Sequence, residues 1–290
     1  MRSGRMKADL ILLTVAIVWG SAFVAQRVAA GQIGVFLFNG LRFLIGALIL
    51  IPLAWRQSRT PGRRLDLSPQ DVLSIALVGM LLFIAAALQQ LGLRFTTAGN
   101  AGFITGLYVV LVPLFLAFGW RQWPRPSIWP ASLLAAAGLF LLSTGGRLAL
   151  NPGDGFELAG AAVWALHVIL IGRLVQRIEV LHLAIGQYLV CGLLSLGAGM
   201  VLENTTWTNL GAVWWTVVYT GIFSIGLGYT LQAVGQKAAP AADAAILLSM
   251  EAVFAALFGW LLLSEGLIPL QMLGSGLMLA GMVLAQVRST

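Results

Sequence analysis

The sequence predicts an all-α polytopic membrane protein with ten transmembrane helices, arranged as two five-helix repeats of inverted topology. Three observations carry this prediction. Hydrophobic residues make up 59% of the 290 residues and charged residues only 9%, whereas about a quarter of an ordinary soluble domain is charged. The apolar residues fall into ten continuous runs, each close to the length that a helix needs to cross a bilayer. The second half of the chain repeats the pattern of the first.

Composition and motifs argue against several other classes of protein. A single cysteine, Cys191, excludes an internal disulfide framework, and with only two histidines we expect no metal centre and no cofactor. The sequence contains no zinc-protease, serine-nucleophile or phosphate-loop motif, so we do not expect an enzyme. The net charge of +7 invites a nucleic-acid interpretation. The basic residues lie in short loops between apolar runs, however, where membrane topology places them.

Charges, prolines and polar clusters separate the apolar runs. Each run is continuously apolar rather than alternating, and each is too long for a barrel strand, so we expect helices. The first run is longer than the core of a typical secretory signal, and we interpret it as a retained helix. The expected spans are 9–29, 35–55, 71–93, 97–119, 127–145, 156–173, 181–202, 211–235, 240–263 and 267–287.

The distribution of lysine and arginine predicts the orientation. If the N-terminus is cytoplasmic, 13 of these residues fall on the cytoplasmic side, and only Arg27, Arg94 and Arg147 fall on the outer side. Cytoplasmic loops of membrane proteins carry such an excess of basic residues. We therefore expect both termini in the cytoplasm. Arg42 remains inside the second span.

The two halves of the sequence match at a nearly constant offset. Trp19 and Trp164 are 145 residues apart, and farther along Gln89 and Gln232 are 143 residues apart. Because matched tryptophan and glutamine positions are not a general property of apolar helices, this indicates a duplication.

The duplication predicts a first repeat at 1–146 and a second at 147–290. Each repeat has five spans, an odd number, so the two must enter the membrane with opposite orientation. Inverted repeats are typical of secondary transporters, in which two similar halves open alternately to either side of a site near the midplane.

Four segments resemble the EamA family of the drug/metabolite transporter superfamily. Val18–Phe23 resembles the opening motif of the family, and Leu41–Phe43 matches its arginine in an apolar second helix. Met250–Leu257 and Gly259–Glu265 match the closing motif of its second repeat, although Ala252 replaces the usual proline. This replacement predicts a straighter ninth span.

The resemblance implies a ten-helix carrier of the bacterial inner membrane, with a central cavity lined by helices from both repeats. The implied function is a secondary transporter that exports small metabolites, above all amino acids, by alternating access. Export of drugs or other metabolites is the alternative, and a channel or lipid-handling membrane protein is a third class. The expected partners are a small-molecule substrate and the lipid bilayer, with proton coupling open. One chain supplies both halves, so a monomer suffices.

Ionisable residues within spans are costly and therefore informative. Arg42 lies near the middle of the second span, where it could bind a substrate carboxylate or serve the structure by bonding helix-end carbonyls. Asp243 and Glu251 are the acidic residues that we expect inside the membrane. Glu251 could bind a proton or an ammonium group in alternation, or could be a neutral acid hydrogen-bonded between helices. Arg42 and Glu251 could also pair with each other.

Further candidates for substrate binding or coupling are aromatic and polar side chains within spans. His167 suits a coupling role because histidine titrates near neutral pH, although a lone histidine in an apolar helix often has a packing role. The aromatic residues could line a cavity or simply pack, and the glutamine could be a hydrogen-bond donor between helices. These residues are Trp19, Tyr108, Trp164, Gln187 and Tyr229.

Small residues recur four apart in two equivalent spans. Gly102 and Gly106 lie in the fourth span, and Ala245 and Ser249 occupy the matching places in the ninth. Small residues at this spacing allow two membrane helices to approach closely. We therefore expect spans four and nine to meet through these residues.

Overall fold

The computed structural model describes residues 2–58, 67–96, 98–147, 151–203, 210–263 and 266–286. The predicted all-α fold is confirmed: this part of the chain is built from helices, and its only bridge joins Ala30 and Ile33. The end of the closing motif, Ser264 and Glu265, lies outside the described residues. The helices are α1 (Arg2–Ala29), α2 (Val35–Ser58), α3 (Pro69–Gly92), α4 (Ala98–Gly106), α5 (Tyr108–Leu114), η1 (Phe115–Gly119), α6 (Ile128–Thr144), α7 (Asp154–Leu174), α8 (Val180–Leu202), α9 (Leu210–Tyr219), η3 (Thr220–Tyr229), α10 (Thr230–Gln236), α11 (Ala241–Ser249), α12 (Glu251–Leu263) and α13 (Pro269–Gln286).

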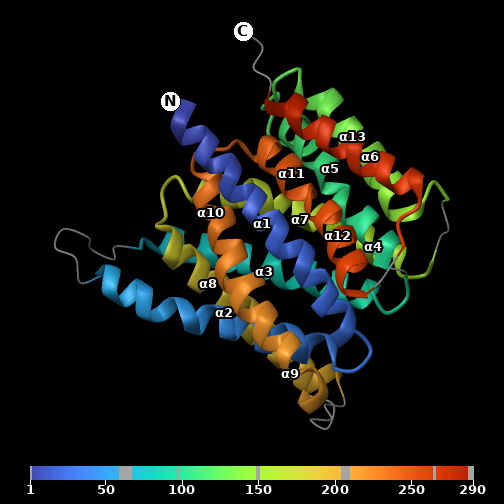
Figure 1. Ribbon diagram of the computed structural model, residues 1–290. Coiled ribbons are helices and arrows are strands. Elements are labelled where there is room, and N and C mark those ends of the chain that lie inside the picture. The colour runs from blue at the N-terminus through green and yellow to red at the C-terminus, as the bar shows by residue number, and fades with distance from the viewer. Residues whose placement is uncertain are drawn as a thin grey trace.

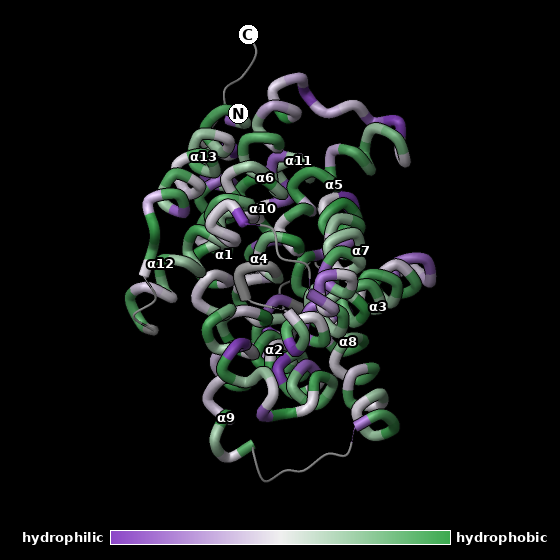
Figure 2. The backbone as a smooth tube through the Cα atoms, turned by 90° about the vertical axis from the view of Figure 1, so that its right-hand side faces the viewer, coloured by the Kyte–Doolittle hydropathy of each residue, from purple (hydrophilic) through white to green (hydrophobic). Residues whose placement is uncertain are grey.

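Each predicted span corresponds to one helix or to consecutive helices. Nine stretches of the described chain are long and apolar enough to cross a membrane, and α6 adds a shorter apolar helix. Many outward-facing side chains are also apolar, such as Leu73, which is 72% exposed, and Val201, which is 82% exposed. Figure 2 shows hydrophobic residues along most of the helices and hydrophilic residues mainly in loops and at helix ends. A surface of this kind is suited to lipid, so the chain is a multi-pass membrane protein.

Two spans are interrupted at equivalent positions. α4 gives way to α5 at Leu107, and α11 gives way to α12 at Met250, 143 residues later. At both breaks the linking N–H donates to the carbonyl three residues back, that of Ile104 at 3.1 Å and that of Leu247 at 3.2 Å. This tighter bonding is the 3₁₀ pattern. Local backbone bonding therefore interrupts the ninth span at Met250 without a proline.

Helices from the first and second halves of the chain lie side by side (Figure 1). α2 packs against α8 and α6 packs against α13, and each pair joins a helix to its own counterpart. Glycines allow the closest approach. A Cβ on Gly138 of α6 would lie 2.5 Å from the carbonyl oxygen of Gly274 on α13, and one on Gly281 would lie 2.7 Å from that of Ala131. At the offset of 143 residues, Gly138 matches Gly281 and Ala131 matches Gly274, so the two contacts join corresponding positions.

The small residues of span four do not meet span nine as expected. A Cβ on Gly106 would collide with the Leu139 side chain of α6, and one on Gly102 would face Ser143 of the same helix. Spans four and nine approach each other chiefly through α5 and α11 instead. The glycines lie in α4, which packs against α6, whereas the segment that meets α11 is α5, beyond the break at Leu107.

The start of α1 and the end of α13 lie on the same side of the helical bundle. Asp243, in the first turn of α11, forms ion pairs with Arg5 of α1, at 3.0 Å, and with Arg125, which precedes α6. Arg125 also donates to the carbonyl oxygen of Ala285 in α13, at 3.1 Å. α1 therefore begins where α13 ends, as Figure 1 shows. We call this side of the molecule the Asp243 end.

Candidate functional site

A central cavity of about 40 Å³ lies between helices of both halves. The cavity is narrow in this conformation. Its lining includes Gln89 and Gln232, which are equivalent positions in the two halves. Seven of the eight candidate residues from the sequence also line it: Trp19, Arg42, Tyr108, Trp164, His167, Tyr229 and Glu251.

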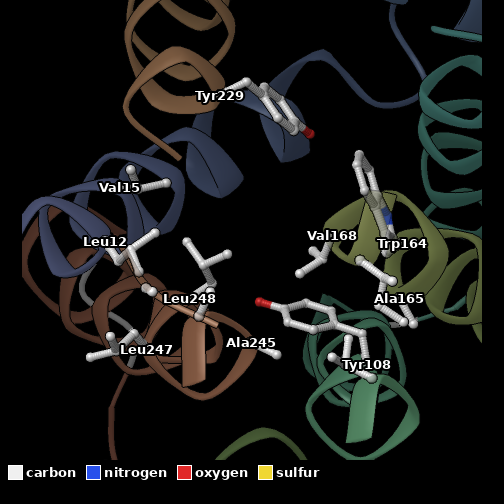
Figure 3. Packing of buried hydrophobic residues seen from close by; sticks show 14 of the residues in the cluster. Leu12, Val15, Tyr108, Trp164, Ala165, Val168, Tyr229, Ala245, Leu247 and Leu248 are labelled. Atoms are coloured by element: carbon white, nitrogen blue, oxygen red, sulfur yellow. The ribbon is translucent and has the colours of Figure 1, made fainter. Parts of the chain in front are cut away.

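Aromatic rings form one wall of the cavity, with Tyr229 at its centre. The Tyr229 ring centroid lies 4.6 Å from that of Trp19 and 6.0 Å from that of Trp164, to which it is nearly parallel, at 18°. Trp19 also donates from Nε1 to the carbonyl oxygen of Ser224, at 3.1 Å. Figure 3 shows Tyr108, Trp164 and Tyr229 extending from three different helices toward a common space. These contacts hold the rings in place and make the wall a preformed surface.

Arg42 is a buried cation with neutral partners. Its guanidinium donates from Nη1 to Oε1 of Gln26, at 2.7 Å, and from Nε to Oδ1 of Asn39, at 3.1 Å. It lies over the rings of Phe38 and Phe43, at 4.9 and 5.3 Å from their centroids. Only 3% of the residue is exposed, and no acidic side chain of the described residues pairs with it. The amide oxygens position the guanidinium but do not neutralise its charge.

Glu251 and Tyr108 meet at the two helix breaks. Tyr108 is the first residue of α5 and Glu251 the first residue of α12, and the Tyr108 hydroxyl donates to Glu251 Oε1 at 3.2 Å. The two residues are 143 apart, so each is the image of the other. Within the described chain, the suggested ion pair between Glu251 and Arg42 is not formed. One carboxyl group and one guanidinium therefore line the same cavity separately.

Gln187 lies behind the cavity wall and holds His167. The Nε2 atom of His167 and Oε1 of Gln187 are 2.9 Å apart, so Nε2 carries the proton of this hydrogen bond. The Nδ1 atom is buried and has no hydrogen-bond partner among the described residues. The imidazole meets Trp164 and Tyr229 edge-on, at 5.8 and 6.1 Å between ring centroids. Gln187 thus orients a cavity residue without lining the cavity itself.

Several polar residues of the site were not singled out from the sequence. Gln26 and Asn39 hold Arg42, and Thr105 lines the cavity beside Tyr108. Asn39 could have been found, because residues three apart share a helix face and it stands three before Arg42. Gln26 gives no such signal, because it belongs to another helix and only the tertiary fold brings it to Arg42.

The expectation for acidic residues within the membrane missed one residue. Glu157 of α7 is fully buried, with 0% of the residue exposed, and accepts a hydrogen bond from Thr105 at 2.7 Å. Asp243 is buried as expected and lies in the first turn of α11 between two arginines. Glu157 escaped notice because it stands beside the start of the predicted span at 156–173, where acidic residues usually contact water and the helix dipole.

A hollow of about 180 Å³ leads toward the cavity from the end opposite Asp243. Glu251 and Phe23 line both the hollow and the central cavity, and Arg27 and Leu93 lie toward the outer part of the hollow. Another hollow, of about 510 Å³, lies at the Asp243 end but shares no lining residue with the cavity. In this conformation, the hollow at the end opposite Asp243 reaches the central cavity more closely than the hollow at the Asp243 end does.

A cavity between helices of both halves of the chain, with two helix breaks beside it, is an arrangement found in membrane transporters. The sequence agrees with this class, since it matches the EamA-like transporter family twice, over residues 6–144 and 151–286. The chain belongs to the EamA-like transporter family.

Individual relatives agree with this assignment. An "Uncharacterized transporter" of Archaeoglobus fulgidus is 31% identical over 285 residues, which cover 98% of this chain and 87% of the relative. The threonine/homoserine exporter RhtA of Escherichia coli (strain K12) is 27% identical over 283 residues, covering 93% and 88% of the two chains. A solved crystal structure has the same fold, with a TM-score of 0.81, 22% identity, and coverage of 97% and 96%.

Proposed function

We propose that this chain exports small metabolites, principally amino acids, across a bacterial inner membrane by alternating access. The observation that carries the proposal is the central cavity, where the buried cation Arg42 and the carboxyl group of Glu251 stand apart from each other. An α-amino acid carries one anionic and one cationic group. A cavity that offers one partner for each is suited to this kind of molecule.

The arginine is the group best placed to recognise a carboxylate. A guanidinium binds a carboxylate through two parallel, charge-assisted hydrogen bonds, which are stronger than its bonds to the neutral oxygens of Gln26 and Asn39. Glu251 would bind the ammonium group, with Tyr108 holding the carboxyl group in place. The similarity to RhtA, a threonine/homoserine exporter, supports the same class of cargo.

The two helix breaks supply a means of alternating access. Leu107 and Met250 lie next to Tyr108 and Glu251, which bond to each other across the cavity. Broken helices at a repeat interface are the usual location of a transporter's substrate site. We propose that 1–146 and 147–290 are the two repeats, which move against each other and open the cavity to one side at a time.

We further propose that the Asp243 end faces the cytoplasm. The groups at this end include Arg5, Arg125 and Lys237, and the backbone of Lys237 is held by Gln176 of the segment after α7. An excess of basic residues marks the cytoplasmic side, which places both termini there. The hollow that reaches Glu251 then opens to the outside, so this conformation faces outward.

Reconstitution into liposomes tests the cargo. The purified chain should exchange a labelled neutral amino acid, and several unlabelled amino acids should compete. Arg42→Ala should weaken apparent affinity by about 10- to 100-fold, the effect of losing a hydrogen bond between charged groups. Decarboxylated analogues should compete poorly with the wild type. Equal competition by amino acids and their decarboxylated analogues would contradict carboxylate recognition by Arg42.

Export of drugs or other metabolites is the second candidate, because Trp19, Trp164 and Tyr229 give the cavity a preformed aromatic wall. Flat apolar molecules would stack on this wall and would not need Arg42. Exchange of such compounds by folded protein, with none for amino acids, would favour this candidate. A channel or lipid-handling protein would show conductance or lipid transfer instead.

A further inference from the structure

Glu157 is a buried carboxyl group that the proposed recognition of cargo does not use. It lies on α7 in its first turns, and none of the residue is exposed. Its Oε1 atom has no hydrogen-bond partner among the described residues, and its Oε2 atom accepts one hydrogen bond, from Thr105. Gly92 of α3 leaves room for this carboxyl group, since a Cβ there would lie 2.5 Å from Oε1.

Polar groups lie on both sides of Glu157, toward one end of the molecule and toward the cavity. Thr105, which donates to Glu157 at 2.7 Å, also lines the central cavity. On the other side, Asp154 precedes Glu157 by three residues, so the two share a face of α7. Asp154 accepts hydrogen bonds from the Thr96 hydroxyl and from the backbone N–H of Asn151, at the end opposite Asp243. Glu157 thus stands between that end and the cavity.

The other half of the molecule shows that packing does not require an acid here. At the repeat offsets, Glu157 corresponds to Leu12 and Gly92 corresponds to Gly235. Leu12 packs against Gly235, where a Cβ would lie 2.8 Å from the Leu12 Cγ atom. Leucine therefore fills the same niche against a glycine in the first span, and the carboxyl group of Glu157 adds something beyond shape.

The same comparison extends to the hydrogen-bond donor. Thr105 corresponds to Leu248, which also lines the central cavity. Leu12 and Leu248 belong to one buried apolar cluster, and Figure 3 shows them near each other. The apolar pair Leu12 and Leu248 thus occupies the positions that correspond to the carboxyl group of Glu157 and the hydroxyl group of Thr105. Only one half can therefore bind a proton at this position.

We propose that Glu157 is the site at which transport is coupled to protons. In the outward-facing state, the carboxylate takes up one proton from the outer phase, past Asp154, and becomes a carboxylic acid. In the inward-facing state, the proton leaves past Thr105 to the inner phase. Cargo then binds and is carried outward. This deepens the proposed function and rests on it, and it separates the proton site from Glu251, which binds cargo.

The surroundings of Glu157 suit a group that gains and loses a proton without a counter-ion. Among the described residues, α3 contributes Gly92 and α4 contributes Thr105, and neither side chain titrates or carries a charge. The neighbouring ionisable group on α7 itself is Asp154. Arg94, just after α3, donates instead to the carbonyl oxygen of Ile33.

Proteoliposomes with an imposed pH gradient test the proposal. In wild type, a gradient of about one pH unit should drive about tenfold accumulation of cargo when one proton exchanges for one cargo molecule. Glu157→Gln should still exchange labelled for unlabelled cargo but should no longer accumulate it in response to the gradient. A response that persists in Glu157→Gln, or that is lost only in Glu251→Gln, would overturn the proposal.

Infrared spectroscopy of the purified protein gives a measurement that does not depend on the cargo. A protonated carboxyl band that titrates in wild type and is missing in Glu157→Gln would support the site; identical titrations would overturn it, even if no amino acid were transported. Absence of amino-acid exchange alone would count against the cargo and not against Glu157.

The double variant Thr105→Leu with Glu157→Leu reproduces the pair found in the other half and controls for folding. It should remain monodisperse because Leu248 and Leu12 already fill the equivalent places. It should lack both the gradient response and the infrared band. Retention of either in the folded double variant would overturn the proposal.

Discussion

Tyr108 connects the two halves through one hydrogen bond to its own counterpart, Glu251. A buried carboxyl group gains orientation from such a bond, and the phenol ring keeps its packing if the hydroxyl is removed. Because both side chains line the cavity, we expect the hydrogen bond to contribute to cargo recognition as well as to stability.

Tyr108→Phe should weaken the apparent affinity for amino acids by about 2- to 10-fold, the effect of losing one hydrogen bond. Competition assays in proteoliposomes measure this change. Tyr188→Phe is the matched control, because Tyr188 is buried and bonds to Thr230 at 3.1 Å without lining the cavity. Equal losses of affinity in the two variants would indicate a general structural effect and would argue against a role for Tyr108 in binding.

The sequence predicted much of the cavity at the level of single residues, for a physical reason. Polar and ionisable groups are costly inside a membrane, so Arg42 and Glu251 are conspicuous in an apolar run. Glu157 was missed because near the start of a span an acid looks ordinary, and its complete burial depends on Gly92 of a different helix. The role of Gln187 as a support for His167 also depends on packing between helices.

At the level of elements, the glycine contacts between α6 and α13 set how closely these helices approach. Gly274 faces the backbone of Gly138, whereas a Cβ on Gly276, two residues later, would meet nothing within 4 Å. The two glycines therefore share a helix and differ only in the face that they occupy.

Gly274→Ala should destabilise the protein by about 1–3 kcal/mol, the usual effect of overpacking a tight contact. Gly276→Ala should be neutral or stabilising, because alanine is the better helix former. Thermal unfolding of the two variants in the same detergent measures the difference. Indistinguishable transitions would show that α6 and α13 are not in close contact in the folded protein.

The limits of the ten spans were predictable because continuous apolar runs end at charges and prolines. The helix breaks were not. Leu107 and Met250 are good helix formers within apolar sequence, and the offset marks them as equivalent without marking them as breaks. A local change from α to 3₁₀ bonding has little signature in composition, so the interruption became visible only in the structure.

At the scale of the whole molecule, the orientation in the membrane can be tested with few background signals. Cys191 is buried, so a membrane-impermeant thiol reagent should react mainly with a cysteine introduced at an exposed site. Gln32 and Lys237 are exposed positions that the proposed topology places on opposite sides.

In intact cells, Gln32→Cys should be labelled and Lys237→Cys should be protected until the membrane is made permeable. The reagent cannot cross the bilayer, so labelling reports the side directly. Gel-shift detection of the labelled protein measures both variants in parallel. Labelling of Lys237→Cys alone in intact cells would reverse the proposed orientation.

The ion pairs around Asp243 have a consequence for the energetics of transport. Arg5 and Arg125 correspond at the repeat offsets to Leu150 and Ile268, which carry no charge. Under the alternating access proposed above, we expect an exchange of roles between the two halves to break these ion pairs, with no charge at Leu150 or Ile268 to replace them. We therefore expect the two conformations to differ in free energy, so that an empty carrier has a preferred side. The gradients still decide the direction of net flow.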